Sequence, residues 1–377
     1  MEPAPRGFCQ VAVPLEMCLN RPMRPIQAKI DLSALRGNLE LLQKHAGGAR
    51  IWGIAKADAY GHGLARIQPA LSAADGLALL ELDAALAARD RGWAKPILLL
   101  EGFFEPSELE LFAQHRLTAV VHQEEQIAML QSARIGAPID VYLKVNSGMN
   151  RLGFAGSGTR AALERLRATA KVSKVTLMTH FADADGDRGV EEQSKAFDEL
   201  VRTLGLPSSS ANSAALLRYP HTHGDWVRPG IFLYGCSPFP EQSAQSLGAR
   251  PVMTLGSRII AVQSVEQGAR VGYSGTFIAP RPMRIGVVAC GYADGYPRHA
   301  PAGTPVLVNG VRTQTLGRVS MDMLFVNLDN VADAGVGSEV TLWGEGLSAD
   351  EVAASAGTVS YELLCGLAAR VPVTVVG

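Results

Sequence analysis

The sequence has no long apolar run and few cysteines. None of its hydrophobic stretches approaches the ~18–20 consecutive apolar residues that a membrane-spanning helix requires. Its cysteines are odd in number, lie far apart and lack the paired spacing and nearby histidines of a zinc site: Cys9, Cys18, Cys236, Cys290 and Cys365. The sequence therefore favours reduced thiols in a cytoplasmic protein, with no membrane span, disulfide framework or metal centre.

A strong net charge is also missing. The 35 Lys and Arg residues nearly balance the 36 Asp and Glu residues, which leaves a formal net charge of −1. We therefore expect no general attraction to nucleic acid or to an anionic membrane, and a small neutral or zwitterionic ligand fits better.

Residues 1–25 carry Glu2, Glu16 and several prolines, which interrupt the apolar core that a signal peptide needs. We interpret this segment as an N-terminal extension.

The length and patterning predict two domains. The 377 residues suit one barrel of ~250 residues and a smaller domain of ~100. In residues 26–246, short β-branched runs alternate with segments of helical period, as in repeated βα units around a parallel sheet. An eight-stranded α/β barrel is the natural closure. Predicted strands are Ile51–Ala55, Pro96–Leu100, Thr118–His122, Asp140–Val145, Val175–His180 and Gly230–Tyr234; predicted helices are Leu32–Lys44, Leu80–Arg91, Gln123–Gln131, Thr159–Ala170 and Val190–Leu204.

Residues 247–377 have a different sequence pattern, in which short predicted strands are separated by turn residues. Asn309-Gly310 lies between the β-rich runs Pro305–Val308 and Val311–Thr315, and both positions of such a tight turn favour positive φ. Further strands are expected at Val252–Val262, Arg284–Cys290, Leu324–Leu328 and Glu339–Trp343. This half is predicted to be a mostly β domain.

Two basic segments of the barrel are candidates for chemistry. Lys56 follows the first convincing strand, where the carboxyl end of a barrel strand faces the active site and apolar neighbours favour a free amine. A free amine can form a Schiff base, although a surface lysine at a strand end is the more common case. Lys144 lies in an apolar strand near Arg151, so an inward-pointing Lys144 needs an added anion as counter-charge. A Lys144 side chain that faces outward would need none.

Other polar positions are weaker signals when each is taken alone. His180 ends a predicted strand, and Ser213 and Arg228-Pro229-Gly230-Ile231 lie in small-residue loops of the kind that bind phosphate. In the β half, three glycine-flanked polar islands surround Tyr273, Tyr292 and Met321-Asp322. Ordinary turn chemistry with aromatic packing explains each island equally well.

Taken together and in order, these segments resemble the alanine racemases, which are fold-type III enzymes that use pyridoxal 5'-phosphate (PLP). The resemblance extends from about Arg24 to Val373. It rests on Lys-Ala-Asp-Ala-Tyr-Gly-His-Gly at 56–63, Ser-Gly-Met-Asn-Arg-Leu-Gly at 147–153, Thr-His-Phe-Ala at 179–182, Asn212-Ser213, Arg-Pro-Gly-Ile at 228–231, Tyr234-Gly235, Val-Gly-Tyr at 271–273, Gly-Tyr-Ala-Asp-Gly at 291–295, Val-Ser-Met-Asp at 319–322, and Tyr361-Glu362 with Cys365.

The resemblance implies a barrel followed by a β domain, a homodimer with shared active sites, and alanine as substrate. Lys56 would hold PLP covalently and act as the base on one face of the substrate Cα. Tyr273 of the other subunit would act on the opposite face, because inversion requires the proton to return from the side opposite its departure. Arg228 would face the pyridine nitrogen and keep it unprotonated, and His180 would link Arg228 to Tyr273.

The resemblance also assigns the remaining site residues. Tyr60, Ser213, Tyr361 and the backbone of Gly230 and Ile231 would bind the phosphate. Arg151 and Met321 would meet the substrate carboxylate, and in relatives the lysine matching Lys144 can be carbamylated, which would supply the missing anion. Asp322 and Tyr292 would support the site, and the narrow entrance would be lined by Tyr292, Arg298, Arg318, Asp185 and Tyr361.

The chain departs from the usual family pattern outside the two bases, with Asn146-Ser147, Ser320 and Phe277 where Asp-Thr, cysteine and tyrosine are more common. Two alternatives are a broad-specificity amino-acid racemase or decarboxylase of the same fold type, and a non-catalytic PLP carrier. Decarboxylases of this fold place a carboxylate against the pyridine nitrogen, where this chain offers Arg228, and carriers resemble the barrel alone. The role could be supply of D-alanine for peptidoglycan or alanine catabolism.

Overall fold

The computed structural model describes residues 24–377. The predicted extension at residues 1–25 therefore lies almost entirely outside the described residues, as do Cys9 and Cys18. No helix within the described range is long and apolar enough to cross a lipid bilayer.

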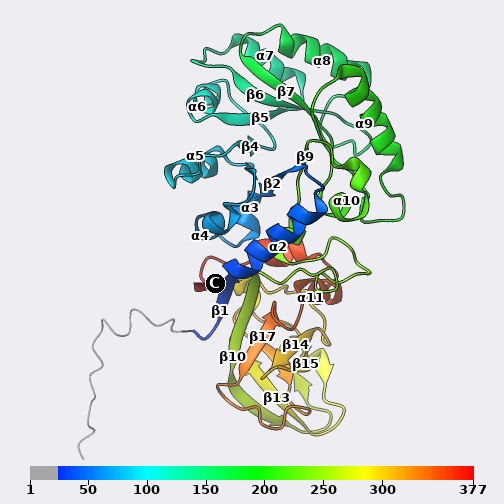
Figure 1. The fold of residues 1–377 in the computed structure, drawn as a ribbon. Coiled ribbons are helices and arrows are strands. Elements are labelled where there is room, and N and C mark those ends of the chain that lie inside the picture. Colours follow the sequence, from blue (N-terminus) through cyan, green and yellow to red (C-terminus); the bar gives the residue numbers. More distant parts are fainter. Residues whose placement is uncertain (1–23) are drawn as a thin grey trace, which may run out of the picture.

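Eight parallel strands form the sheet of the barrel (Figure 1). They are β2 (Arg50–Ile54), β3 (Gly76–Leu79), β4 (Ile97–Leu99), β5 (Leu117–Val121), β6 (Ile139–Lys144), β7 (Val172–Met178), β8 (Ser208–Ser209) and β9 (Trp226–Val227). The order is β8-β7-β6-β5-β4-β3-β2-β9, with β8 and β9 at its two ends. Hydrogen bonds from Asp225 N to Ser208 O (3.0 Å) and from Ser209 Oγ to Trp226 O (2.8 Å) join these ends, so the sheet closes on itself.

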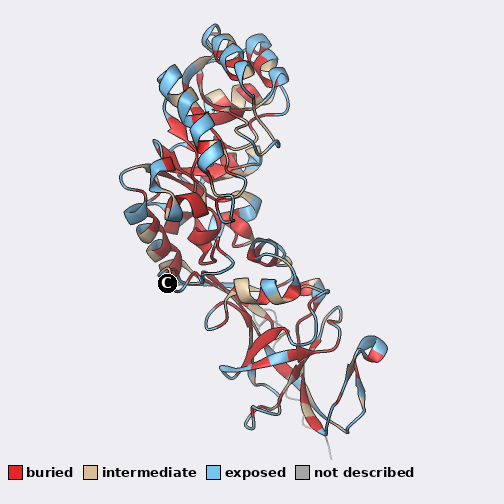
Figure 2. Cartoon of the chain, turned by 90° about the vertical axis from the view of Figure 1, so that its right-hand side faces the viewer, coloured by how far each residue is buried: buried red, intermediate tan, exposed pale blue. Residues whose placement is uncertain are grey.

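Helices cover the outside of this sheet, and their inward faces are apolar. Figure 2 shows buried strands at the centre of the barrel and exposed helix surfaces around them. The helices are α2 (Leu32–His45), α4 (Leu64–Ile67), α5 (Leu82–Asp90), α6 (Glu108–Gln114), α7 (Glu124–Ser132), α8 (Ser157–Arg167), α9 (Glu191–Leu204) and α10 (Ser213–Arg218). The short segment α3 (Lys56–Tyr60) follows β2 at the carboxyl end of the barrel and is a left-handed turn. Each of the five predicted barrel helices is present, with ends that differ by up to three residues.

The barrel strands are less completely predicted from the sequence. The predicted strand Gly230–Tyr234 is wrong, because Ile231–Tyr234 form a 3-10 helix, η3, in which Leu233 N donates to Gly230 O (3.0 Å). A buried apolar run of this length does not distinguish a strand from a short helix. The strands β3, β8 and β9 were not predicted; β8 and β9 have only two residues each, too few for a periodic pattern.

The second sheet also has eight strands and contains the start, the second half and the end of the described chain. They are β1 (Gln27–Asp31), β10 (Met253–Val265), β13 (Met283–Val288), β14 (Pro305–Val308), β15 (Val311–Leu316), β16 (Leu324–Asn327), β17 (Glu339–Trp343) and β18 (Val373–Val376). The predicted hairpin is confirmed: β14 pairs with β15, and Asn309 and Gly310 have φ values of 48° and 78°. A short ribbon, β11 (Arg270–Val271) with β12 (Phe277–Ile278), and helices α11 (Ala349–Ala356) and α12 (Ser360–Cys365) complete this half.

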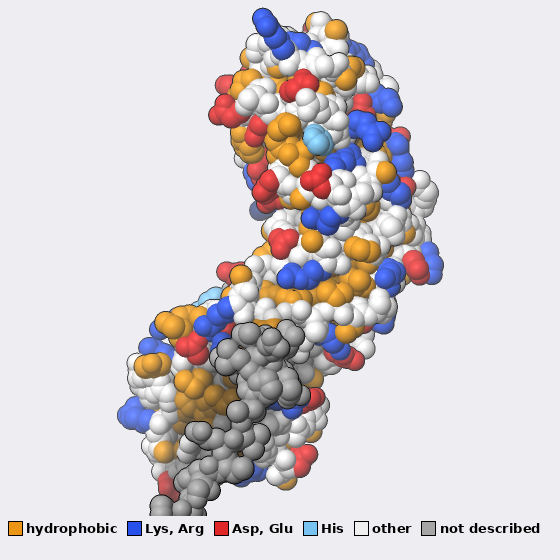
Figure 3. Space-filling view, turned by 90° about the vertical axis from the view of Figure 1, so that its left-hand side faces the viewer, with side chains coloured by type: hydrophobic (Ala, Val, Ile, Leu, Met, Phe, Trp, Pro, Cys, Tyr) orange, Lys and Arg blue, Asp and Glu red, His pale blue; other side chains and the backbone are white. Residues whose placement is uncertain are grey.

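Strand β1 pairs antiparallel with β10 and parallel with β18, so the described chain begins in the second sheet before it enters the barrel. The domain boundaries at residues 25/26 and 246/247 remain predictions. Helix α12 contacts α3, and this contact brings the C-terminal half against the mouth of the barrel. On the face shown in Figure 3, basic and acidic side chains are interspersed.

Candidate active site

A cavity of about 870 Å³ opens at the carboxyl ends of the barrel strands. Each of the eight strands is followed within a few residues by one that lines it or itself ends in one, from Lys56 after β2 and Leu80 after β3 to Asn212 and Ser213 after β8 and Arg228 after β9. Parallel closure therefore gathers side chains that lie far apart in the sequence. The predicted site residues that line this cavity are Lys56, Tyr60, Lys144, Arg151, His180, Asp185, Ser213, Arg228, Gly230, Ile231 and Tyr361.

Lys56 is followed by a left-handed turn. Ala57, Asp58, Ala59 and Tyr60 have φ values of 52°, 48°, 57° and 54°, a run that L-residues rarely adopt because Cβ crowds the carbonyl oxygen. The turn is held from both ends: Leu64 N donates to Asp58 Oδ1 (2.8 Å), and His62 Nδ1 lies 2.9 Å from both the Ala59 and Tyr60 carbonyl oxygens. A strained conformation of this kind persists only where surrounding contacts hold it in place. Here those contacts fix the backbone beside Lys56.

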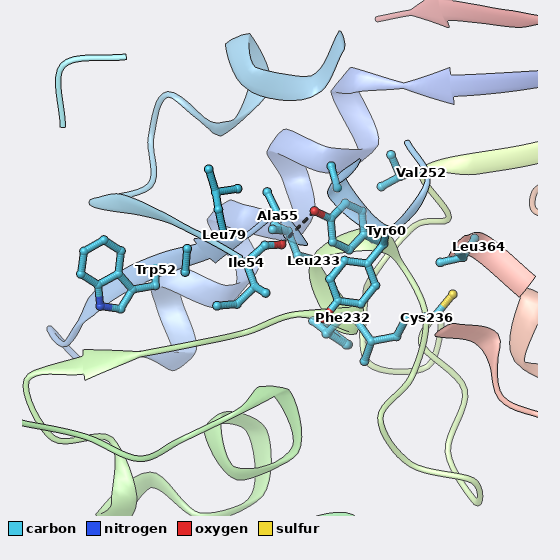
Figure 4. Packing of buried hydrophobic residues seen from close by; sticks show 14 of the residues in the cluster. Trp52, Ile54, Ala55, Tyr60, Leu79, Phe232, Leu233, Cys236, Val252 and Leu364 are labelled. Atoms are coloured by element: carbon cyan, nitrogen blue, oxygen red, sulfur yellow. Dashed lines mark hydrogen bonds between the residues drawn. The ribbon is translucent and has the colours of Figure 1, made fainter. Parts of the chain in front are cut away.

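Tyr60 anchors this turn in the core. Its ring stacks on that of Tyr234, with centroids 4.7 Å apart, and lies 6.0 Å from the ring of Tyr361 in the C-terminal half. Tyr234 in turn donates its hydroxyl to Ile54 O at the end of β2 (2.8 Å). Figure 4 shows Tyr60 in this cluster with Ile54 and Phe232. The side chains of Tyr60 and Tyr361 are therefore largely removed from water. This burial raises the pKa of both hydroxyls.

The cavity has a polar cradle where η3 begins. Ser213 Oγ accepts from Gly230 N (2.8 Å), and Asn212 caps α10 by accepting from Ala215 N (3.0 Å). A Cβ at position 230 would collide with Tyr60 Oη, so only glycine allows this hydroxyl to approach the backbone there. A serine hydroxyl, a tyrosine hydroxyl and backbone N–H groups thus meet in one place, as phosphate binding requires.

Arg228 is buried and points across the cavity floor. Its guanidinium donates to Ser209 Oγ (2.6 Å), Thr179 O (2.6 Å) and Ser210 O (3.1 Å), all neutral acceptors. Burial lowers the pKa of Arg228 to about 10, so it stays charged at neutral pH. These bonds fix the plane of a cation that carries no carboxylate partner in this site.

The rest of the cavity is also cationic. Burial, followed by the nearby charges of Arg228, Arg151 and Lys56, holds the pKa of Lys144 well below its usual range. Burial and the charges of Arg228, Lys144, Arg151 and Lys56 likewise lower the pKa of His180. Crowding of this kind destabilises every added positive charge, and bound anions would relieve it. The cavity is therefore suited to ligands that carry phosphate and carboxylate groups.

The unusual residues at 146 and 147 have defined roles. Asn146 Oδ1 accepts from Gly148 N (3.1 Å) and Asn150 N (3.0 Å), which shapes the loop that carries Arg151. Ser147 Oγ lies 2.7 Å from Thr179 Oγ1 and accepts from Gln193 Nε2 (3.2 Å), which joins this loop to the one bearing His180. An amide and a shorter hydroxyl therefore provide the loop contacts in this chain.

The other predicted site residues lie away from this cavity. Tyr273 is 70% exposed, and Tyr292 and Met321 also project into solvent from the second half of the chain. Arg298 and Arg318 line a separate cavity with Thr276. Asp322 lies on the same segment as Met321 and pairs with Arg370 (2.6 Å). One copy of the chain thus brings Tyr361 together with the barrel residues and leaves Tyr273, Tyr292, Met321 and Asp322 apart from them.

Several residues that line the cavity are not among those predicted from the sequence. Glu101 and His122 both follow barrel strands, and their positions at strand ends were an available signal. Phe104 and Pro238 come from irregular loops, where no periodic pattern marks them. Gly102 has a φ of 79° and approaches Val120 O so closely that a Cβ would not fit, which explains the path of the loop before Phe104.

The fold and the cavity define an α/β barrel with a lysine and a polar cradle at the carboxyl ends of its strands, followed by a β-rich half. Residues 30–238 match the family described as alanine racemase, N-terminal domain, and residues 252–375 match alanine racemase, C-terminal domain. The chain belongs to the alanine racemase family and is an enzyme of that class.

Individual relatives agree with this membership. Alanine racemase of Nitrosomonas eutropha is 54% identical over 354 residues, 93% of this chain and 98% of the relative. The catabolic alanine racemase of Klebsiella aerogenes is 54% identical over 351 residues, 93% of this chain and 99% of the relative. The crystal structure of the biosynthetic alanine racemase of Pseudomonas aeruginosa superimposes with a TM-score of 0.91 at 47% identity, covering 94% of this chain and all (100%) of that one.

Proposed function

We propose that this protein interconverts L-alanine and D-alanine with PLP, in active sites shared between two copies of the chain. The observation that carries the proposal is the placement of Lys56 in a cationic cavity together with Arg228, Ser213 and Tyr60. Membership of the alanine racemase family supports the same reaction.

The residues of the cavity fit PLP. Lys56 would hold the cofactor covalently through its amine, and the cradle of Tyr60, Ser213 and Gly230, extended by Ile231 and Tyr361, would bind its phosphate. Arg228 would face the ring nitrogen, where a charged guanidinium disfavours protonation of that nitrogen. When bound, PLP supplies an electron sink that makes the substrate Cα–H acidic.

Two bases would then handle the proton at the substrate Cα. Lys56 Nζ acts on one face and Tyr273 Oη of the partner copy on the other, because inversion of Cα needs proton delivery from the side opposite to removal. Tyr273 supports this arrangement by its 70% exposure, which leaves its hydroxyl free to enter another chain's site. His180 lies in the cavity with Arg228 and would connect that cation to Tyr273.

The substrate carboxylate would be held by Arg151 and by the Met321 segment of the partner copy. Lys144 lies near Arg151 with a depressed pKa, and a free amine is the form that reacts with carbon dioxide. A carbamate on Lys144 would place a negative charge near Arg228 and Arg151, and its presence can be read in the folded protein as a carbamate carbon resonance after equilibration with 13C-labelled bicarbonate.

The proposed reaction is tested by incubating purified protein and PLP with L-alanine in D2O, followed by chiral chromatography with mass detection. We expect D-alanine that carries deuterium at Cα. If no D-alanine forms while the cofactor is bound, the proposal fails for alanine; other amino acids then test a broad-specificity racemase, and inactivity toward all of them indicates a PLP carrier.

The two bases make separable predictions. Lys56→Ala should abolish the visible absorbance of covalently bound cofactor, and an unchanged spectrum after cofactor exchange would contradict its assignment.

Tyr273→Phe should slow proton removal from L-alanine by ~100-fold or more, with a smaller effect on removal from D-alanine. Single-turnover exchange of the Cα hydrogen measures both directions, and equal losses would count against two bases.

The cellular role is proposed to be either supply of D-alanine for peptidoglycan or use of alanine as a nutrient. Relatives named for each role match nearly the whole chain, at 54% identity for the one named catabolic and 47% for the one named biosynthetic. A deletion strain that needs added D-alanine for growth would indicate the first role. One that grows without it but no longer uses alanine as a nutrient would indicate the second.

A further inference from the structure

A carboxylate that the proposed mechanism does not use lies fully buried in the second half of the chain, where Arg24 from the start of the described residues and Arg370 from near their end meet it. The Asp294 side chain has no exposed surface and accepts four hydrogen bonds. Arg24 donates to both of its oxygens (2.7 and 3.1 Å), Arg370 Nε donates to Oδ1 (2.8 Å) and Gly291 N donates to Oδ2 (2.9 Å).

The same two arginines also reach Asp322. Arg370 Nη2 donates to Asp322 Oδ1 (2.6 Å), and Arg24 Nη2 donates to the Asp322 carbonyl oxygen (3.0 Å). Each planar guanidinium thus bridges the 291–295 turn and the 320–322 segment. Arginine suits this bridging because its N–H donors have fixed directions and can reach two acceptors at once, whereas the single ammonium group of lysine cannot. We call these four residues, Arg24, Asp294, Asp322 and Arg370, the clamp.

The two bridged segments also contact each other directly through their backbones. Tyr292 N donates to Ser320 O (3.0 Å), and Ala293 N donates to Met321 O (3.0 Å). Gly291 leaves no room for a Cβ against the Ser320 and Met321 carbonyls, so the segments approach as closely as chains can. Tyr292 and Met321 therefore belong to one rigid unit, and their side chains project from it into solvent.

We propose that the clamp positions Tyr292 and Met321 for the partner's active site, so that Asp294, Arg24 and Arg370 set substrate affinity without touching substrate. This inference rests on the proposed function, in which Met321 meets the substrate carboxylate and Tyr292 lines the entrance. Asp294 suits the task because burial alone would raise its pKa, yet the bonds from Arg24 and Arg370 lower it and keep the carboxylate charged.

The test compares Arg370→Met with wild type and with Arg258→Met. Arg258 makes an ion pair of similar length with Glu339 (2.9 Å) between β10 and β17 of the second sheet, and its side chain bonds to neither bridged segment. For Arg370→Met we expect KM for both alanine enantiomers to rise about tenfold while kcat stays within about twofold, because an interaction with bound substrate is weakened and the two bases remain. Arg258→Met should leave both constants unchanged.

Conservative replacement separates positioning from simple charge. Arg370→Lys keeps the positive charge but can reach only one of the two carboxylates, so it should recover only part of the lost affinity. Full recovery by lysine would overturn the bridging geometry. If Arg370→Met does not fold, Arg24→Gln replaces the other bridging guanidinium, which donates three hydrogen bonds to Asp294 and to the Asp322 carbonyl oxygen, and gives the same test.

Dimer mass and thermal unfolding of each variant are measured alongside. A rise in KM that appears only together with dissociation to monomers would overturn the positioning role and make the clamp a structural element. An unchanged KM in a folded, dimeric Arg370→Met would also overturn it. Absence of racemisation by the wild type in the same assay would instead overturn the proposed function, so the two failures are distinguishable.

Discussion

At the scale of single residues, the main cost of the site is the left-handed turn after Lys56. Four successive residues there have φ between 48° and 57°. For each alanine among them, this conformation costs about 1 kcal/mol of conformational free energy relative to a right-handed one. This strain is not visible in the sequence, because Lys-Ala-Asp-Ala-Tyr is an ordinary helix-forming composition. The contacts of Tyr60 and His62 impose it.

Glycine substitution tests this strain. Ala57→Gly should change the free energy of unfolding by less than ~0.5 kcal/mol, because relief of the positive φ offsets the greater chain entropy of glycine. Ala128→Gly, at an exposed alanine in the right-handed helix α7, should cost about 1 kcal/mol. Denaturant unfolding of both variants checks the contrast. Equal losses would show that the turn is not strained.

His62 makes stability depend on pH. Burial lowers its pKa to about 4, against about 6.5 in the unfolded chain, so the unfolded state binds a proton first as pH falls. Between about pH 8 and pH 5 this group should therefore remove about 2 kcal/mol of stability. The stability difference between wild type and His62→Gln, measured by denaturant unfolding, should shrink by that amount on acidification. A constant difference would contradict the burial of a neutral ring.

At the scale of elements, helix α2 illustrates how local sequence and tertiary position combine. Asp31 ends β1 and caps α2, accepting from Ser33 N (2.8 Å) and Ala34 N (3.0 Å). The cap was recognisable in the sequence because Asp precedes an apolar-periodic segment. The pairing of β1 with β10 and β18 was not, since strand partners are chosen by packing that a single segment does not encode.

Replacement of this cap should be felt in stability. Asp31→Ala should lower the free energy of unfolding by about 1 kcal/mol, whereas Asp31→Asn, which keeps an accepting oxygen, should cost less than half of that. Thermal or denaturant unfolding at neutral pH measures both. Because hydrogen bonds from Ser33 and Ala34 lower the pKa of Asp31 despite its partial burial, the advantage over alanine should fade as the carboxylate is protonated in acid.

At the scale of the whole molecule, the separation of Lys56 from an exposed Tyr273 predicts that function needs two chains. Lys56→Ala and Tyr273→Phe homodimers should each be nearly inactive. Subunit exchange between them should restore about a quarter of wild-type activity, because half of the dimers are mixed and each mixed dimer has one intact site. Racemisation before and after exchange measures this. No recovery would place both bases in the same chain.

The sequence by itself determined the class of the fold, five of the barrel helices and the hairpin at Asn309-Gly310, because periodicity and turn chemistry are local properties. It also marked Lys56 and Arg151, since basic residues that follow apolar strands are conspicuous, whereas Arg228 was marked only as part of a small-residue loop. Only the tertiary structure decided that all eight strands of the barrel direct residues into one cavity, that Gly230–Tyr234 is not a strand, and that Arg24 and Arg370 meet at Asp294. Those outcomes depend on chain closure and on contacts between segments hundreds of residues apart, and no local pattern carries that information.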